Sequence, residues 1–136
     1  MNLPKRNTKY AAGYDIEAAE DIVVPKFKPG QKPTLVKTGL KAYMQPDEMI
    51  VLANRSSNPK KTGLILANGV GIIDADYYEN EGNDGHIMFQ FINVKDEDTQ
   101  IKKGDRIGQA IFQKYLVTDD DIAGGERTGG FGSTGK

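Results

Sequence analysis

Cysteine is absent from this 136-residue sequence, and His86 is its only histidine. Without cysteine the chain has no disulfide framework and no thiolate nucleophile. One histidine cannot supply the three or four histidine or thiolate ligands of a zinc site, and a catalytic triad would depend on His86, which begins an apolar segment. The chemistry that remains is that of carboxylates and of metal ions that prefer oxygen ligands.

A basic excess and a long apolar run are also missing. The net charge is -1 and the pI is near 5.8, which argues against a general affinity for the nucleic-acid backbone, because few counterions could be released. No segment is long and apolar enough to span a membrane, and the N-terminus does not resemble a secretory signal. We expect a cytoplasmic protein that binds neither membranes nor nucleic acid stably.

The apolar segments are short and separated by turn signals, and glycine occurs 16 times. This pattern favours an all-β domain. Strands are predicted at residues 14–18, 22–24, 34–44, 48–53, 64–67, 70–73, 86–94 and 106–117. One short helix is predicted, capped by Asn58, with Pro59 in its first position and Gly63 at its end. With no internal repeat or linker, the expected architecture is a single sandwich or jelly roll.

Residues 64–77 carry several functional signals. Asn68-Gly69 between two apolar runs predicts a tight two-residue hairpin, whose backbone and Asn68 amide could read the edge of a base. Gly71 leaves bare backbone against which a flat ligand could lie. Asp74 follows two isoleucines that we expect to be buried, and a carboxylate there needs a partner or a task. A purely structural hairpin is an equally good interpretation of these residues.

The C-terminal residues 124–136 are rich in glycine. They contain the pattern G-x-x-x-x-G-K, but we do not expect a P-loop, because that motif follows a strand, continues into Ser or Thr and opens a helix. Glycine would let the backbone approach an anion, Arg127 could hold phosphate oxygens, and Phe131 offers a flat face to a base. The alternative is a disordered polar tail.

Arg55-Ser56-Ser57 follows the strand predicted at residues 48–53. A guanidinium beside two hydroxyls can hold phosphate oxygens through charge-assisted hydrogen bonds. Together with the arginine and hydroxyls of the tail, this group would contact phosphates from a distant part of the chain. Taken alone, it is a common loop sequence.

Asp15 lies between apolar neighbours on a predicted strand, with Glu17 on the same face. The simpler interpretation is a solvated strand face. The alternative is that Asp15 orders the waters around Mg²⁺, which often binds through one carboxylate together with substrate phosphates. We interpret the acidic residues in the segments 74–84 and 119–121 as solvated charge.

Five blocks of sequence, in the order AAGYDI, NRSSNPKKTGL, NGVGIIDADY, GDRIGQAIF and RTGGFGSTG, resemble the five motifs of trimeric dUTPases. The resemblance implies a jelly-roll or distorted β-barrel subunit with one short helix, in a homotrimer with active sites at subunit interfaces. It also implies Mg²⁺ carried by the nucleotide phosphates. The implied reaction is hydrolysis of dUTP to dUMP and pyrophosphate, which keeps uracil out of DNA and supplies dUMP for dTMP synthesis.

The resemblance also gives roles to single residues. Asp74 would be the general base that activates a water for in-line attack on the α-phosphorus, and Asp15 would contact the metal through water. The residues implied in substrate binding are Arg55, Ser56, Ser57, Asn68, Gly71, Ile72, Ile73, Tyr77, Met88, Gln109, Arg127, Phe131, Gly132, Ser133 and Thr134.

Within that set, Asn68 and the backbone of residues 71–74 would recognise uracil. Tyr77 would stack on the deoxyribose and exclude a 2′-hydroxyl, with Met88 flanking the sugar. The Arg-Ser-Ser group and Gln109 would hold the phosphates.

The resemblance divides the chain into a β domain, residues 1–123, and a flexible lid, residues 124–136, that completes the site when it closes. Arg127, Ser133 and Thr134 would bind the γ-phosphate, and Phe131 would cover the uracil. Arg127 stands four residues before Phe131, one fewer than the commonest spacing.

Residues 78–84 depart from the commonest family pattern. Tyr78 and an acidic loop replace a short Arg-Gly or Gln-Gly, as in phage and some Gram-positive members. Two other functions stay open: deamination of dCTP by an enzyme of similar fold, and a phage-encoded nucleotide-sensing module that controls a regulatory protein partner. The acidic loop is where such a partner would be sought first.

Overall fold

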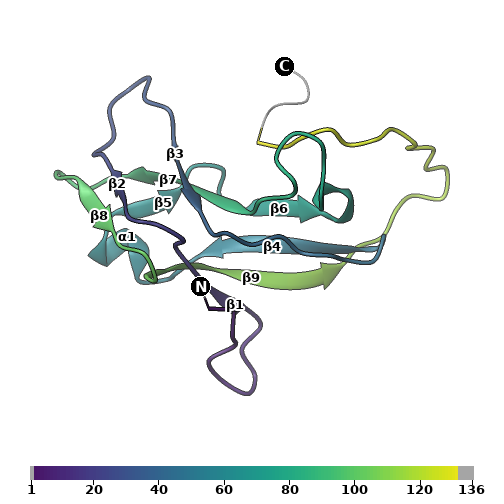
Figure 1. Ribbon diagram of the computed structural model, residues 1–136, viewed down its shortest axis with the longest axis horizontal. Coiled ribbons are helices and arrows are strands. Elements are labelled where there is room, and N and C mark those ends of the chain that lie inside the picture. The colour runs from purple at the N-terminus through teal and green to yellow at the C-terminus, as the bar shows by residue number, and fades with distance from the viewer. Residues whose placement is uncertain (1, 132–136) are drawn as a thin grey trace.

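The computed structural model describes residues 2–131. Over this range the chain is nearly all β, as predicted (Figure 1). The strands are β1 (Tyr14–Glu17), β2 (Ile22–Val24), β3 (Thr34–Lys37), β4 (Glu48–Asn54), β5 (Leu64–Leu66), β6 (Gly71–Asp74), β7 (Met88–Asn93), β8 (Thr99–Ile101) and β9 (Arg106–Lys114), with helix α1 (Asn58–Lys61) and the 3-10 turn η1 (Ala75–Tyr77). No helix in the described range is long and apolar enough to cross a membrane.

The strands form three sheets. A four-stranded sheet has the order β1-β9-β4-β6, a three-stranded sheet the order β3-β7-β5, and β2 pairs with β8. All pairings between these strands are antiparallel, and the arrangement is consistent with the predicted jelly roll. Strand β6 is an edge of its sheet, and this position matters for the site below.

Strand β7 runs through the core. Phe89, Phe91 and Asn93 point inward and are buried, while the residues between them face the other side, as the period of a strand requires. The two rings stack with their centroids 5.9 Å apart, and burying a side chain of this kind contributes about 1.5–3 kcal/mol. Asn93 is tolerated there because its amide donates to the carbonyls of Val24 and Glu97.

The hairpin predicted at Asn68-Gly69 is wrong in its pairing. The turn exists: Gly69 has a φ of 78°, and its N–H donates to the carbonyl of Leu66. The two arms then separate into different sheets, β5 against β7 and β6 against β4. Leu66 and Ile73 are both buried, so each arm covers the core as part of its own sheet.

Three local predictions also differ from the structure. Strand β3 ends at Lys37, far short of the predicted strand, because the chain turns at Gly39 with a φ of 70°. Strand β8 has three residues and was not predicted. At helix α1 the N-cap is Ser57 and not Asn58, since the Asn58 side chain is buried and its amide donates to the carbonyl of Ile107.

Candidate active site

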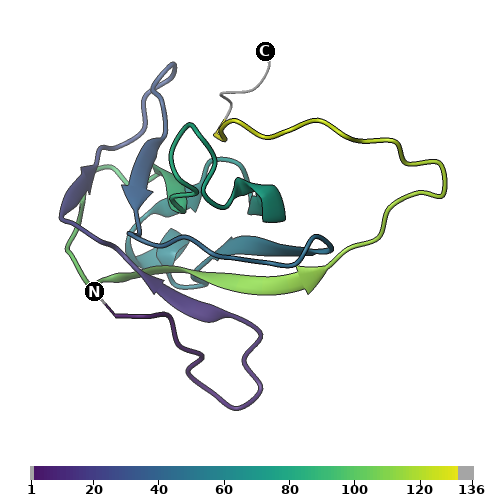
Figure 2. The same cartoon turned by 45° about the vertical axis from the view of Figure 1, so that its right-hand side comes forward.

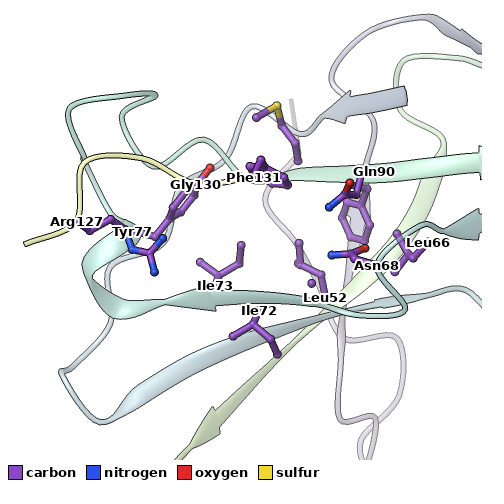
Figure 3. A pocket seen from close by; sticks show the side chains of 13 residues that line it. Leu52, Leu66, Asn68, Ile72, Ile73, Tyr77, Gln90, Arg127, Gly130 and Phe131 are labelled. Atoms are coloured by element: carbon purple, nitrogen blue, oxygen red, sulfur yellow. The ribbon is translucent and has the colours of Figure 1, made fainter. Parts of the chain in front are cut away.

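A pocket of about 130 Å³ lies beside strand β6 (Figure 3). Eight of its lining residues were predicted from the sequence: Asn68, Gly71, Ile72, Ile73, Tyr77, Met88, Arg127 and Phe131. Five others complete the lining: Leu52, Leu66, Phe89, Gln90 and Gly130. The structure therefore gathers the residues expected to hold a base and a sugar around one small cavity, together with Arg127, which was expected at the γ-phosphate.

Strand β6 presents backbone groups to this pocket. It pairs with β4 along one side, from Met49 opposite Asp74 to Leu52 opposite Gly71, and no other strand in the described range pairs with its second side. The N–H and C=O groups of that second side are those of a sheet edge and can pair with a ligand. A planar ring with donors and acceptors along its edge could therefore bind here as an additional strand would.

Tyr77 closes one end of the pocket. Its side chain is buried, and its hydroxyl donates to the carbonyl of His86. The hydroxyl oxygen in turn accepts a hydrogen bond from Asn83 Nδ2 at 2.9 Å. Burial raises the pKa of the phenol, and the Asn83 donor and the charge of Arg127 oppose this shift only in part. Tyr77 therefore stays neutral and fixed in orientation.

The C-terminal segment covers the Tyr77 ring. After β9 the chain leaves the sheets and returns over the end of the molecule that carries η1 (Figure 2). The backbone at Gly130 lies so close that a Cβ there would be 2.6 Å from Tyr77 Cε1. Phe131 meets the ring edge-on, with the centroids 6.2 Å apart. Only glycine at position 130 allows this approach.

Asp74 is the last residue of β6 and directly follows Ile73, which lines the pocket. Arg127 Nη2 donates to Asp74 Oδ2, and Arg127 Nε donates to Asp76 Oδ1 at 2.8 Å. The residue expected to act as general base, Asp74, and a residue expected to bind phosphate, Arg127, are thus in direct contact. The two isoleucines before Asp74 are not both buried as we expected: Ile73 is 5% exposed, but Ile72 points outward and is 51% exposed.

A second group of predicted residues gathers near the other end of β4. The strand register places Asp15 and Ala53 on either side of Gln109. Arg106 Nη1 lies 3.7 Å from Asp15 Oδ2, and Arg55 Nη1 donates to the carbonyl of Arg106 at 3.2 Å. Two guanidinium groups, a carboxylate and an amide therefore meet, and such a group can hold phosphate oxygens.

The two groups are well separated within one chain. Asp74 lies opposite Met49, near the start of β4, whereas Arg55 follows the last residue of that strand, Asn54. At roughly 3.3 Å per residue, the separation along β4 is about 20 Å. Within a single chain, Arg55 cannot hold the same phosphate that Asp74 would act on.

Two further predicted residues, Ser56 and Ser57, directly follow Arg55. Ser56 is exposed and Ser57 half-buried, in the turn that precedes α1. Gly132, Ser133 and Thr134 lie outside the described residues.

Gln90 and Arg106 are the most informative residues that sequence reasoning missed. Gln90 lies two residues after Met88 on the same face of β7, and Figure 3 shows its amide near that of Asn68 in the pocket. Strand alternation from Met88 could have identified it. Arg106 stands within one of the quoted motifs, but only the pairing of β1 with β9 brings it to Asp15.

The described residues contain no group of three or more histidine, cysteine or acidic side chains placed to bind a metal ion directly. Asp15 Oδ2 is buried and accepts no hydrogen bond within the described chain. It can therefore accept one from a metal-bound water, and this fits the indirect magnesium contact expected for Asp15.

A β domain with a small pocket beside a sheet edge, a carboxylate at the end of that edge strand and separate arginines for phosphates has the parts of a nucleotide phosphohydrolase. The family model for dUTPase matches residues 1–135. The deoxyuridine 5′-triphosphate nucleotidohydrolase of Lactococcus lactis is 53% identical over 137 residues, which cover 99% of this chain and 89% of the relative. The chain belongs to the dUTPase family.

Solved structures agree with this assignment. The crystal structure of dUTPase from Streptococcus mutans matches with a TM-score of 0.81 and 46% identity, over 86% of this chain and 88% of that one. The dUTPase from phage phi11 of S. aureus matches with a TM-score of 0.73 over 90% of this chain and 88% of that one. Its identity is 22%, so that likeness shows the shared fold.

Proposed function

We propose that this chain hydrolyses dUTP to dUMP and pyrophosphate, with Asp74 as the general base. One observation carries the proposal: Asp74 ends the strand whose free edge lines the pocket, so a nucleotide bound through its base along β6 would extend its phosphates past this carboxylate. The pocket is small, which favours a single-ring base.

Uracil recognition would use the edge of β6 and the amide of Asn68. Backbone donors and acceptors of residues 71–74 match the alternating groups along one edge of uracil, and cytosine presents the opposite pattern at its amino group. Tyr77 would pack against the deoxyribose, where its buried ring leaves little space for a 2′-hydroxyl.

The chemical step would follow once Asp74 is released from Arg127. The nucleotide phosphates offer Arg127 a stronger anion than one carboxylate, so substrate binding draws the guanidinium away. Asp74 then accepts a proton from water as the water oxygen bonds to the α-phosphorus. The bond between that phosphorus and the oxygen bridging to the β-phosphate breaks, and pyrophosphate leaves.

We propose that the sites are completed between copies of the chain, in a homotrimer. The outer face of the four-stranded sheet carries a row of Ile72, Val51 and Ile111, paired across three strands, and none of the three is buried. Packing of this apolar row against another copy would cover it. It would also allow Arg55 of one copy to approach Asp74 of the next, which the separation within one chain forbids.

Residues 124–136 would act as a lid, because Gly130 and Phe131 already lie against the Tyr77 ring. Mg²⁺ would enter with the nucleotide, and Asp15 would accept a hydrogen bond from one of its waters. When bound, the ion neutralises charge on the phosphates. Gln109 would donate its amide N–H to a phosphate oxygen.

The test is a nucleotide panel with Mg²⁺ and pyrophosphate detection. We expect pyrophosphate from dUTP and much slower release from dTTP, dCTP and UTP. Absence of pyrophosphate from dUTP would overturn the proposal. Ammonia release from dCTP would instead indicate the deaminase of similar fold.

A further inference from the structure

Residues 79–85 form an ordered loop around the buried side chain of Asn80. Its acidic side chains are exposed to solvent, as predicted. Asn80 is 7% exposed, and its amide is fully used. Its Oδ1 accepts the N–H groups of Gly82 at 2.9 Å and Asn83 at 3.1 Å. Its Nδ2 donates to the carbonyl of Tyr77 at 2.6 Å and to Asn83 Oδ1 at 2.8 Å.

The acidic side chains lie on the outside of this loop. Lys41 Nζ reaches Glu79 at 2.7 Å and Asp84 at 3.1 Å, and it lies 5.3 Å from the centre of the Tyr78 ring. These exposed pairs contribute little stability on their own. The loop is therefore held together mainly by the hydrogen bonds of the Asn80 and Asn83 amides inside it.

Asn83 extends that network to the pocket. Its Oδ1 accepts from Asn80 Nδ2 and from the N–H of Gly85 at 3.2 Å. Its Nδ2 is thereby oriented to donate to Tyr77 Oη at 2.9 Å, and the Tyr77 hydroxyl in turn donates to the carbonyl of His86. The phenol is held by one donor, Asn83 in the loop, and one acceptor, the carbonyl of His86 directly after the loop.

The bond from Asn83 to Tyr77 is not needed to close the loop. Backbone bonds from the N–H of Asp84 to the carbonyl of Asn80, and from the N–H of His86 to the carbonyl of Asn83, already do so. The contact therefore constrains the ring more than the loop.

We propose that Asn83 is a positioning residue, which fixes the Tyr77 ring so that it discriminates against a 2′-hydroxyl on the bound sugar. The proposal rests on the proposed function, in which Tyr77 packs on the deoxyribose. Excluding one hydroxyl requires a wall held to within about 0.5 Å, because a ring free to tilt by more would admit the extra oxygen. Asn83 supplies that restraint without touching the substrate.

The experiment is a double-mutant cycle on the ratio of kcat/KM for dUTP to kcat/KM for UTP. We expect Asn83→Ala to lower this ratio about fivefold, the effect of losing one hydrogen bond. Tyr77→Phe removes the same bond from the other side and should lower the ratio to a similar extent. The two variants share the loss of the bond between Asn83 and Tyr77, although Tyr77→Phe also removes the bond from the hydroxyl to the carbonyl of His86 and Asn83→Ala also removes the acceptor for Asn80 and Gly85. The shared bond can be lost only once, so the fold loss of the ratio in the double variant should be smaller than the product of the two single losses. Glu81→Ala, in the same loop but without a hydrogen bond or ion pair among the described residues, should keep the wild-type ratio.

A wild-type ratio in Asn83→Ala, or effects that add in the double variant, would overturn the proposal. If Asn83→Ala does not fold, Tyr77→Phe decides: an unchanged ratio overturns it and a reduced ratio supports it. Tyr77→Ala separates this inference from the proposed function. If Tyr77→Ala keeps the wild-type ratio for dUTP over UTP, the proposed contact between Tyr77 and the sugar is wrong. If Tyr77→Ala lowers the ratio but Asn83→Ala and Tyr77→Phe do not, only the role of Asn83 is overturned.

A titration provides a readout that a loss of stability would not produce. The Asn83 donor lowers the pKa of the Tyr77 phenol, so Asn83→Ala should raise it further. Carbon-13 NMR of labelled tyrosine, assigned with Tyr77→Phe, measures this shift. An unchanged Tyr77 titration would show that the hydrogen bond does not form in solution, and would overturn the proposal.

Discussion

Arg127 donates to the carboxylate of Asp74 across 53 residues of sequence, and so joins the C-terminal segment to the end of an edge strand. In the mechanism that we propose, nucleotide phosphates and Asp74 would be alternative partners for this one guanidinium. The position of the C-terminal segment and the availability of Asp74 as a base would then be coupled: while Arg127 lies on Asp74 the carboxylate is occupied, and a bound triphosphate that takes Arg127 would leave it free to accept a proton.

Asp74→Asn should bind dUTP but lose turnover. The amide keeps the size of the side chain and cannot accept the proton of water, so we expect kcat to fall by about 10²- to 10⁴-fold. Asp76→Asn is the matched control, because Asp76 also accepts from Arg127 but does not end the strand that lines the pocket. Steady-state kinetics and dUTP binding measure both. A kcat for Asp74→Asn within a few-fold of wild type would show that another group is the base.

Deleting residues 124–136 should reduce kcat/KM for dUTP by at least about 100-fold while changing the melting temperature little. Of residues 124–131 only Gly129 is buried, so the segment contributes little to the core. It supplies the contacts of Arg127 and Phe131, and Arg127→Ala should reproduce part of the loss. A large drop in melting temperature on deletion would instead identify the segment as a structural part of the domain.

Local patterns predicted most strands but not which sheet each one joins. Asn68-Gly69 specifies a turn, because its backbone geometry is local. Whether the arms after such a turn pair with each other depends on partners elsewhere in the chain, here β7 for one arm and β4 for the other. Strand β8 was not predicted, because a strand of three residues shows almost no periodic pattern in the sequence.

The candidate site shows the same division. Asp74 was predicted because a carboxylate beside apolar residues needs a partner or a function, and Phe131 because a ring in a glycine-rich segment offers a flat face to a base. The family resemblance supplied Tyr77. Asn80 and Asn83 were not predicted, because asparagine and glycine are ordinary loop residues. Only their three-dimensional contacts distinguish a turn that positions a tyrosine from a turn that merely reverses the chain.

Gly13→Ala should impair phosphate binding through Gln109. A Cβ at position 13 would lie 2.2 Å from Gln109 Oε1, the mobile end of a long side chain, so the amide would swing aside while the backbone stays in place. We expect an increase in KM for dUTP of about tenfold with little loss of stability. In the background of Gln109→Ala, Gly13→Ala should have no further effect. An additional loss there would mean that Gly13 acts by another route.

Acid should destabilise the fold in part through His86. Burial is the main cause that lowers the pKa of His86 below its usual 6.5, and Lys37 adds to it while Glu20 opposes it. Its Nε2 accepts the N–H of Gly39 at 3.0 Å, which only the neutral ring can do. The unfolded chain thus binds a proton more readily, so this contribution is complete above pH 6.5 and declines as the pH falls toward the lower folded pKa.

His86→Gln isolates that contribution, because its amide oxygen can accept the same N–H without titrating. Melting temperatures of wild type and variant should approach each other between about pH 8 and about pH 5.5 as the wild type loses stability faster. A difference that stays constant over this range would show that His86 does not titrate differently in the folded and unfolded states.

Mixing two inactive variants tests whether the active site is shared between copies of the chain. Arg55→Ala keeps Asp74, and Asp74→Asn keeps Arg55. If each site takes Asp74 from one copy and Arg55 from another, assemblies that contain both variants regain some sites with both native residues. Random mixing of equal amounts should restore about a quarter of the wild-type activity, because each site needs the right copy in each of two positions.

The matched control mixes Arg55→Ala with the double variant Arg55→Ala/Asp74→Asn, which has no native Arg55 in any copy and should stay inactive. Co-expression with two affinity tags ensures that mixed assemblies form and can be purified. Recovery in the first mixture alone requires a site built across copies, as the separation of about 20 Å along β4 demands. Lack of recovery in purified mixed assemblies would mean that Arg55 and Asp74 serve the same site from one chain, after a rearrangement of β4 and its neighbours, or that Arg55 binds no phosphate.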